Sequence, residues 1–169
     1  MFAWNAVAQE GAPPPQGVHL QIGSASVHAL ELPREVHIPI SLSFVSAVEV
    51  TRVRLEISFA PKLLSFLGTT RGRAVRLASA KIETASRAGE NGQHVLSLDV
   101  LAPKPIPKGT LLTLDFDVSK MAQTEDAVRL SFVNYSAESS DGRPVQADGV
   151  GGIITIDASP MPACFFYMH

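Results

Sequence analysis

The sequence has little of several features that would point directly to a function. Its one cysteine is Cys164, near the end, so the rest of the chain has no thiol pair for an internal disulfide and no thiolate metal site. The formal net charge of −2 gives no electrostatic case for binding nucleic acid. No stretch approaches the roughly 18 consecutive apolar residues that a membrane-spanning helix needs.

Aromatic side chains and catalytic motifs are also scarce. The single tryptophan is Trp4, close to the start, and Tyr135 is the only tyrosine outside the last few residues. A module that stacks sugar rings needs aligned aromatic side chains, so their scarcity argues against carbohydrate binding as the main function. Carbohydrate binding is kept as the alternative function, with a polysaccharide held in a hydrogen-bonding cleft. No Gly-x-Ser-x-Gly, phosphate-loop or His-Glu-x-x-His motif is present, and the sequence predicts a protein that is not an enzyme.

Glycine and proline are plentiful, with twelve of each, and most lie between apolar runs. The last third of the chain shows the pattern best, because Val128, Leu130 and Phe132 alternate with polar residues as in a half-buried strand. Asp141-Gly142 then supplies a turn, and a glycine-rich break precedes a closing strand at 153–156. This order of strand, turn, short strand, break and closing strand is typical of a β-sandwich.

Alternation and breakers together predict about nine strands. They lie near 18–23, 36–42, 48–59, 63–67, 73–87, 94–101, 110–118, 127–135 and 150–156. Only 81–87 and 120–125 have any helical character, and the prolines of 103–109 exclude a central strand there. The expected fold class is therefore all-β, an antiparallel β-sandwich.

Four segments, in this order, resemble the cohesin module, a nine-stranded jelly-roll that binds dockerin modules. They are Val36–Leu42, Val53–Phe66, Gly109–Val118 and the closing Asp141–Ile156. Ala60 stands where family members often carry aspartate. The resemblance covers about 18 to 156 and implies jelly-roll topology, shared with related carbohydrate-binding sandwiches.

The resemblance also implies a partner-binding face, because the binding sheet of cohesins includes the strands that resemble the third, fifth, sixth and eighth here. Arginine suits such a face because its guanidinium group makes directional bidentate contacts, and two outward valines would give it a dry centre. For any single residue, a solvated outer sheet is an equally good interpretation. The candidate partner-binding residues are Arg52, Arg54, Glu56, Arg76, Val95, Ser97, Asp99, Arg129, Ser131 and Val133.

No metal site or cofactor is expected in this chain. The five histidines form no compact ligand motif, and surface or strand-edge positions are the favoured interpretation. Asp115 and Asp117 share one strand face, where they could bind a cation, act as a carboxylate pair or simply be solvated; solvation is favoured. If the partner is dockerin-like, calcium would belong to the partner.

The ends divide the chain into a leader and proline-rich linker at 1–17, the sandwich at 18–157, and a proline linker with an apolar tail at 158–169. The small residues Ala6 and Ala8 suggest a signal-peptidase site after a truncated signal peptide, with a short leader as the alternative. We therefore expect a secreted or cell-envelope protein. The tail from Cys164 to His169 would either dock elsewhere, as in an accessory domain of a surface assembly, or fold back.

Overall fold

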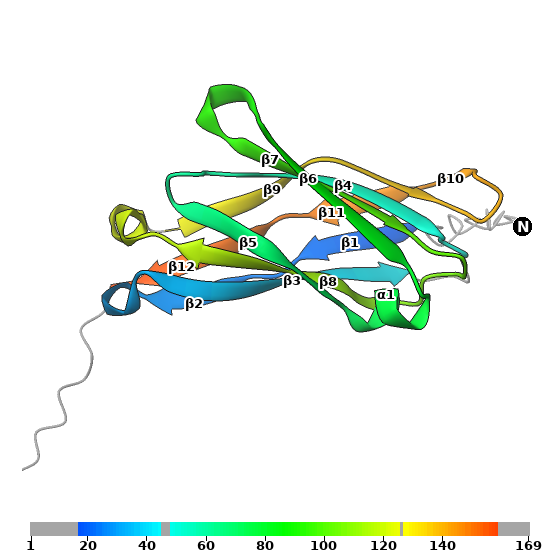
Figure 1. Cartoon of the computed structure of the whole chain (residues 1–169), viewed down its shortest axis with the longest axis horizontal. Helices are drawn as coiled ribbons and strands as arrows, with labels where there is room; N and C mark the ends of the chain where they lie inside the picture. The colour runs from blue at the N-terminus through cyan, green and yellow to red at the C-terminus, as the bar shows by residue number, and fades with distance from the viewer. Residues whose placement is uncertain (1–16, 45–47, 126, 159–169) are drawn as a thin grey trace, which may run out of the picture.

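Two β-sheets packed face to face make up the described part of the protein (Figure 1). The computed structural model describes residues 17–44, 48–125 and 127–158. Apart from residues 17 and 158 themselves, the predicted leader and tail lie outside these residues. The prediction of an all-β jelly-roll sandwich is confirmed, with twelve strands instead of nine.

The smaller sheet has five strands in the order β11-β1-β3-β8-β5. They are β11 (Ala147–Val150), β1 (Val18–Ile22), β3 (Arg34–Phe44), β8 (Gly109–Val118) and β5 (Leu64–Arg71). The larger sheet has seven strands in the order β2-β12-β9-β4-β7-β6, with β10 paired to β9. They are β2 (Ala25–His28), β12 (Gly152–Asp157), β9 (Ala127–Glu138), β4 (Arg52–Phe59), β7 (His94–Leu101), β6 (Lys81–Ala88) and β10 (Pro144–Val145).

Short helices connect some of the strands. They are η1 (Ala29–Glu31), α1 (Arg73–Leu77), η2 (Glu90–Gly92) and η3 (Lys120–Thr124). The helical character predicted at 120–125 corresponds to η3, whose N-cap Ser119 accepts a hydrogen bond from the Met121 N–H. None of the helices in the described ranges is long and apolar enough to cross a membrane.

Alternating apolar side chains from both sheets form the core. Val53, Leu55 and Ile57 of β4 are fully buried, as the alternation predicts. Phe59 of β4 meets Phe116 of β8 edge to face, with ring centroids 5.2 Å apart. Because these strands belong to different sheets, this aromatic pair ties the two layers together.

The chain crosses between the sheets repeatedly, and two of these crossings, from β1 to β2 and from β11 to β12, touch. β1 lies in the smaller sheet and β2 in the larger, with Gly23 between them. β11 and β12 are divided between the sheets in the same way. A Cβ on Gly152 would lie 2.1 Å from the Gly23 carbonyl oxygen, so only glycine fits at this crossing. The glycine-rich break seen in the sequence is thus the second of these two crossings.

The segment 73–87 was predicted as one strand; this is correct for 81–87 and wrong for 73–80. It folds as α1 followed by β6, so the helical character predicted for 81–87 is also wrong. The Gly72 N–H donates to the Leu111 carbonyl, which ends β5 against β8, and Ala74 and Val75 then enter the core on α1. Tertiary packing therefore overrides the local strand pattern. The short strand β2 was not predicted, and the one short strand expected between the Asp141-Gly142 turn and the glycine break is two strands, β10 and β11.

Candidate functional site

The strands expected to form a partner-binding face lie side by side. In the larger sheet β9, β4, β7 and β6 are consecutive, and they correspond to the predicted eighth, third, sixth and fifth strands. Their paired outward residues form cross-strand rows, which together we call the mixed-charge face. The rows are Lys81–Leu101–Arg52–Glu138, Glu83–Asp99–Arg54–Ser136, Ala85–Ser97–Glu56–Asn134 and Arg87–Val95–Ser58–Ser131.

Asp99 joins the two arginines of β4. The Arg52 Nε donates to Asp99 Oδ1 at 3.0 Å, and a second Arg52 nitrogen contacts the other carboxylate oxygen. Arg54 Nε lies 3.7 Å from Asp99 Oδ2, and its Nη1 donates to Glu138 Oε1 at 2.7 Å. The hydrogen bond from Arg52 lowers the pKa of Asp99 below its ordinary value, so the carboxylate stays charged.

Glu56, also on β4, is held by residues of β6 and β7. An Arg87 guanidinium nitrogen lies 3.2 Å from Glu56 Oε1, and the Ser97 hydroxyl approaches the same oxygen at 3.5 Å. Six charges of the face are therefore paired within the chain before any partner binds; they are those of Arg52, Arg54, Glu56, Arg87, Asp99 and Glu138. Such preorganisation lowers the entropy lost on binding.

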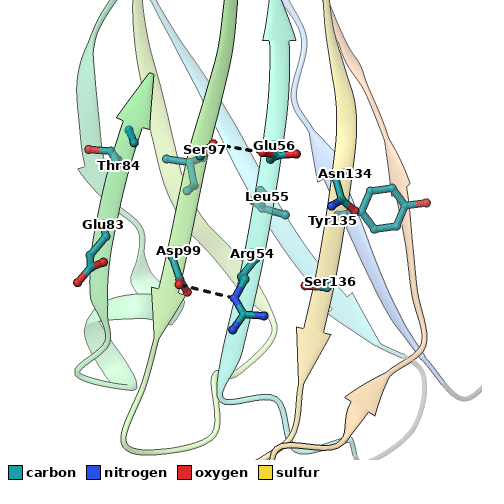
Figure 2. A pocket seen from close by; sticks show the side chains of 12 residues that line it. Arg54, Leu55, Glu56, Glu83, Thr84, Ser97, Asp99, Asn134, Tyr135 and Ser136 are labelled. Atoms are coloured by element: carbon teal, nitrogen blue, oxygen red, sulfur yellow. Dashed lines mark hydrogen bonds and ion pairs between the residues drawn. The ribbon is translucent and has the colours of Figure 1, made fainter. Parts of the chain in front are cut away.

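A hollow of about 510 Å³ opens on this face (Figure 2). It lies where Ala85 and Ser97 leave space beside Glu56, and Arg54 and Asp99 border it along the neighbouring row. In Figure 2 the labelled polar side chains of β6, β7, β4 and β9 line it from one side of the sheet to the other. The lining residues are Arg54, Leu55, Glu56, Glu83, Thr84, Ala85, Ser97, Leu98, Asp99, Asn134, Tyr135 and Ser136.

Comparison with solved structures finds the same architecture in cohesins. The non-cellulosomal cohesin of Archaeoglobus fulgidus superimposes with a TM-score of 0.65 at 16% identity, covering 84% of this chain and 92% of that one. A type I cohesin–dockerin complex from Clostridium thermocellum gives a TM-score of 0.69 at 15% identity, with 83% and 99% covered. This chain has a cohesin fold.

A third structure agrees with this assignment. The third cohesin of ScaC from Acetivibrio cellulolyticus, in complex with the ScaB dockerin, gives a TM-score of 0.69 at 21% identity, covering 83% of this chain and 99% of that one. No family model matches the sequence, and no curated protein matches it. At these identities the likeness to cohesins is one of fold, so any function must be argued from the side chains.

Two predicted residues of the face do not lie where the sequence indicated. Arg76 lies on α1, because the fifth strand begins later than predicted. Val95 does occupy an outward position, opposite Ser58, but it is only 4% exposed. A Cβ on Gly89 would lie 2.8 Å from a methyl carbon of Val95, so the chain beyond β6 covers this valine. Neither residue is an exposed part of the face.

β9 contains a bulge that changes which residues point outward. Glu56 pairs with Asn134 but Ile57 pairs with Phe132, so Val133 is the extra residue. Ser131 and Val133 are exposed as predicted, Val133 at 53%. Beyond the bulge the alternation shifts by one residue, because an inserted residue reverses the phase of the strand. Arg129 is exposed but lies next to β12, beyond the end of β4.

Several residues of the face were missed by the sequence analysis. On β6 they are Lys81, Glu83, Ala85 and Arg87, which alternate in a segment to which helical character was assigned. On β9 they are Asn134, Ser136 and Glu138, which follow the bulge. The alternation from 81 to 88 was a usable signal for the first set, whereas nothing in the sequence marks the bulge.

No group of potential metal ligands lies on the mixed-charge face within the described residues. The group found among the described residues comprises Glu35, His37 and Asp115, and it lies on the smaller sheet.

Proposed function

We propose that the mixed-charge face docks a folded protein partner, of dockerin type or another secreted or envelope protein, without catalysis. The observation that carries the proposal is the hollow lined by hydrogen-bonding side chains on β9, β4, β7 and β6. On the cohesin fold, these are the strands that the resemblance assigns to partner binding.

The dimensions of the face suit one or two helices of a partner. Strands lie about 4.8 Å apart and alternate residues about 6.8 Å apart, so these rows span roughly 14 Å by 20 Å. A helix with its side chains is about 10 Å across. Arg54 and Glu56 would give orientation, because paired surface charges contribute specificity and association rate more than raw affinity.

Carbohydrate binding receives no comparable support from the hollow. Tyr135 is the only aromatic residue among its lining residues. Its ring packs edge to face against Phe132, with centroids 5.4 Å apart, and both belong to the partly buried shell of the core. Figure 2 shows this ring turned away from the other labelled side chains. The hollow therefore has no aromatic ring placed to stack on a sugar.

A pair of neighbouring substitutions tests the docking proposal. Ala85→Tyr would fill the hollow without removing an ion pair, whereas Ser86→Tyr adds the same side chain to the other side of β6. The full chain would first be used to capture proteins from secreted and envelope fractions. A panel of purified dockerin modules would also be tested for binding to it. Binding of each captured or panel protein would then be measured by calorimetry.

We expect Ala85→Tyr to weaken binding at least about tenfold and Ser86→Tyr to leave it within about threefold. Circular dichroism and thermal unfolding would verify that both variants are folded. Equal binding by the unmodified chain and Ala85→Tyr would show that the hollow is not the docking site.

A further inference from the structure

The outward face of the smaller sheet differs in charge from the mixed-charge face. By ladder pairing, its described outward positions include no lysine or arginine. We call its titratable residues the acidic face; they are His19, Glu35, His37, Asp115, Asp117 and Asp148. Carboxylates that no arginine or lysine neutralises create a negative potential that attracts cations.

Three residues of the acidic face converge. His37 and Asp115 are directly opposite each other on β3 and β8, with His37 Nδ1 2.7 Å from Asp115 Oδ1. Glu35 lies two residues before His37 and therefore on the same side of β3. One ligand atom from each of the three lies within 4.8 Å of the others.

The Asp115 carboxylate is already oriented for such a role. The Thr70 hydroxyl of β5 donates to Asp115 Oδ2 at 3.1 Å, which leaves Oδ1 directed at His37. The Asp115 side chain is 17% exposed, whereas that of His37 is 63% exposed. Hydrogen bonds of this kind orient metal ligands and strengthen binding. The arrangement thus combines one fixed carboxylate with an imidazole that is open to solvent.

The ligand spacing suits a small tetrahedral ion after a modest adjustment. With metal–ligand bonds of about 2.0–2.1 Å, tetrahedral ligand atoms lie roughly 3.3 Å apart. His37 and Asp115 would separate slightly, and the exposed Glu35 side chain would move inward by on the order of 1 Å. An imidazole with two carboxylates favours a first-row transition metal over calcium or magnesium.

We propose that Glu35, His37 and Asp115 bind a divalent transition metal ion, with Zn²⁺ as its most suitable representative. The fourth coordination position faces solvent and would hold water or a ligand from another molecule. Asp117, which pairs with Glu35 across the strands, adds negative charge beside the ion. This proposal is independent of the docking proposal, because the two sites lie on opposite sheets.

The acidic face offers a matched control for the test. His19 Nδ1 lies 2.6 Å from Asp148 Oδ1, in a pair that resembles that of His37 and Asp115. Among the described residues no third ligand joins this pair in a metal-binding group. His19→Gln therefore removes an imidazole from the same face without removing a proposed ligand.

The experiment is a calorimetric titration of the full chain with Zn²⁺ at about pH 7.5. Cys164→Ser would be the common background, so that the thiol does not contribute. We expect one Zn²⁺ ion to bind tightly to each chain. His37→Gln and Asp115→Asn should each lower the affinity for this ion at least about tenfold, whereas His19→Gln should leave it unchanged. Zn²⁺ should also raise the melting temperature of the background protein but not that of His37→Gln.

Amide and imidazole NMR spectra locate the ion independently of any substitution. Zn²⁺-induced shifts concentrated at residues 35, 37 and 115 would support the site. Shifts elsewhere, an unchanged affinity in His37→Gln, an equal loss in His19→Gln or an absence of zinc binding would each overturn it.

Discussion

The two outer faces of the sandwich both carry carboxylates, but only one face has arginine side chains that pair with them. On the mixed-charge face, Asp99 and Glu138 contact Arg52 or Arg54, and Glu56 contacts Arg87. On the acidic face the described carboxylates contact histidines or a hydroxyl group, or lie opposite one another.

The comparison shows which positions the fold leaves free. Inward positions of both sheets are apolar because the common core requires it, whereas outward positions make no such demand. On the larger sheet these positions carry opposite charges that pair with one another, and for them we propose a protein partner. On the smaller sheet they carry carboxylates and histidines, and for them we propose a metal ion. Each difference between the faces can be altered without touching the core.

The largest expected effect comes from the crossing on which both faces depend. In Gly152→Ala the new methyl group would lie 2.1 Å from the Gly23 carbonyl oxygen, and backbone must move to admit it. We expect the free energy of unfolding in urea to fall by about 3 kcal/mol. Gly68→Ala is the matched control, because nothing lies within 4 Å of its added Cβ, and should change stability by less than about 1 kcal/mol. An unaffected Gly152→Ala would mean that the crossing tolerates a side chain.

Neutralising one carboxylate on each face should give effects of opposite sign. Asp99→Asn leaves Arg52 without its carboxylate partner, and we expect it to cost about 1 kcal/mol of stability. Asp117 makes no ion pair within the described part of the chain and lies directly opposite Glu35. Asp117→Asn should therefore stabilise the protein by about 0.5 kcal/mol. Urea unfolding without added metal measures both, and equal signs would contradict the comparison.

The inward positions of each sheet could be predicted from the sequence, because apolar and polar residues must alternate in a strand with one buried side. Val53, Leu55 and Ile57 are buried in this way on β4, and Leu114 and Phe116 on β8. Their outward neighbours on β4 and β7 were consequently identified from phase alone. Local periodicity was sufficient wherever a strand stayed regular.

Predictions failed where tertiary contacts decide the structure. α1 forms because the chain turns at Gly72 against β8, and a positive φ of 55° at Ser79 ends the turn before β6. The phase of β9 changes at Val133, which has no local signature. The cluster of Glu35, His37 and Asp115 was missed because His37 and Asp115 are 78 residues apart in sequence and meet only through strand pairing.

Acid should weaken the mixed-charge face through Asp99. The hydrogen bond from Arg52 holds the pKa of Asp99 below its ordinary value of 3.8, so the unfolded chain takes up a proton at this group before the folded protein does. The stabilisation is thus complete above the unfolded pKa and is lost as the pH falls through the lowered one.

We expect unfolding free energies measured from about pH 5 to about pH 2.5 to fall more steeply for the unmodified chain than for Asp99→Asn. Because Asp99 is 29% exposed, the difference should stay under about 1 kcal/mol. Arg52→Gln should flatten the slope in the same way, and identical slopes for all three proteins would contradict the assignment.

Salt gives the smallest effect and distinguishes charge from other consequences of substitution. Raising the ionic strength from about 0.05 M to 1 M shortens the screening length to about 3 Å, less than the separation expected between opposed side chains on adjacent strands. We expect the gain of Asp117→Asn to shrink by about 0.3 kcal/mol, because repulsion from Glu35 is screened in the unmodified chain as well. The loss in Asp99→Asn should change less, since its contacts with Arg52 are direct hydrogen bonds. If the gain in stability of Asp117→Asn persists in high salt, it comes from strand propensity. Repulsion between Asp117 and Glu35 on the acidic face would then be ruled out as its cause.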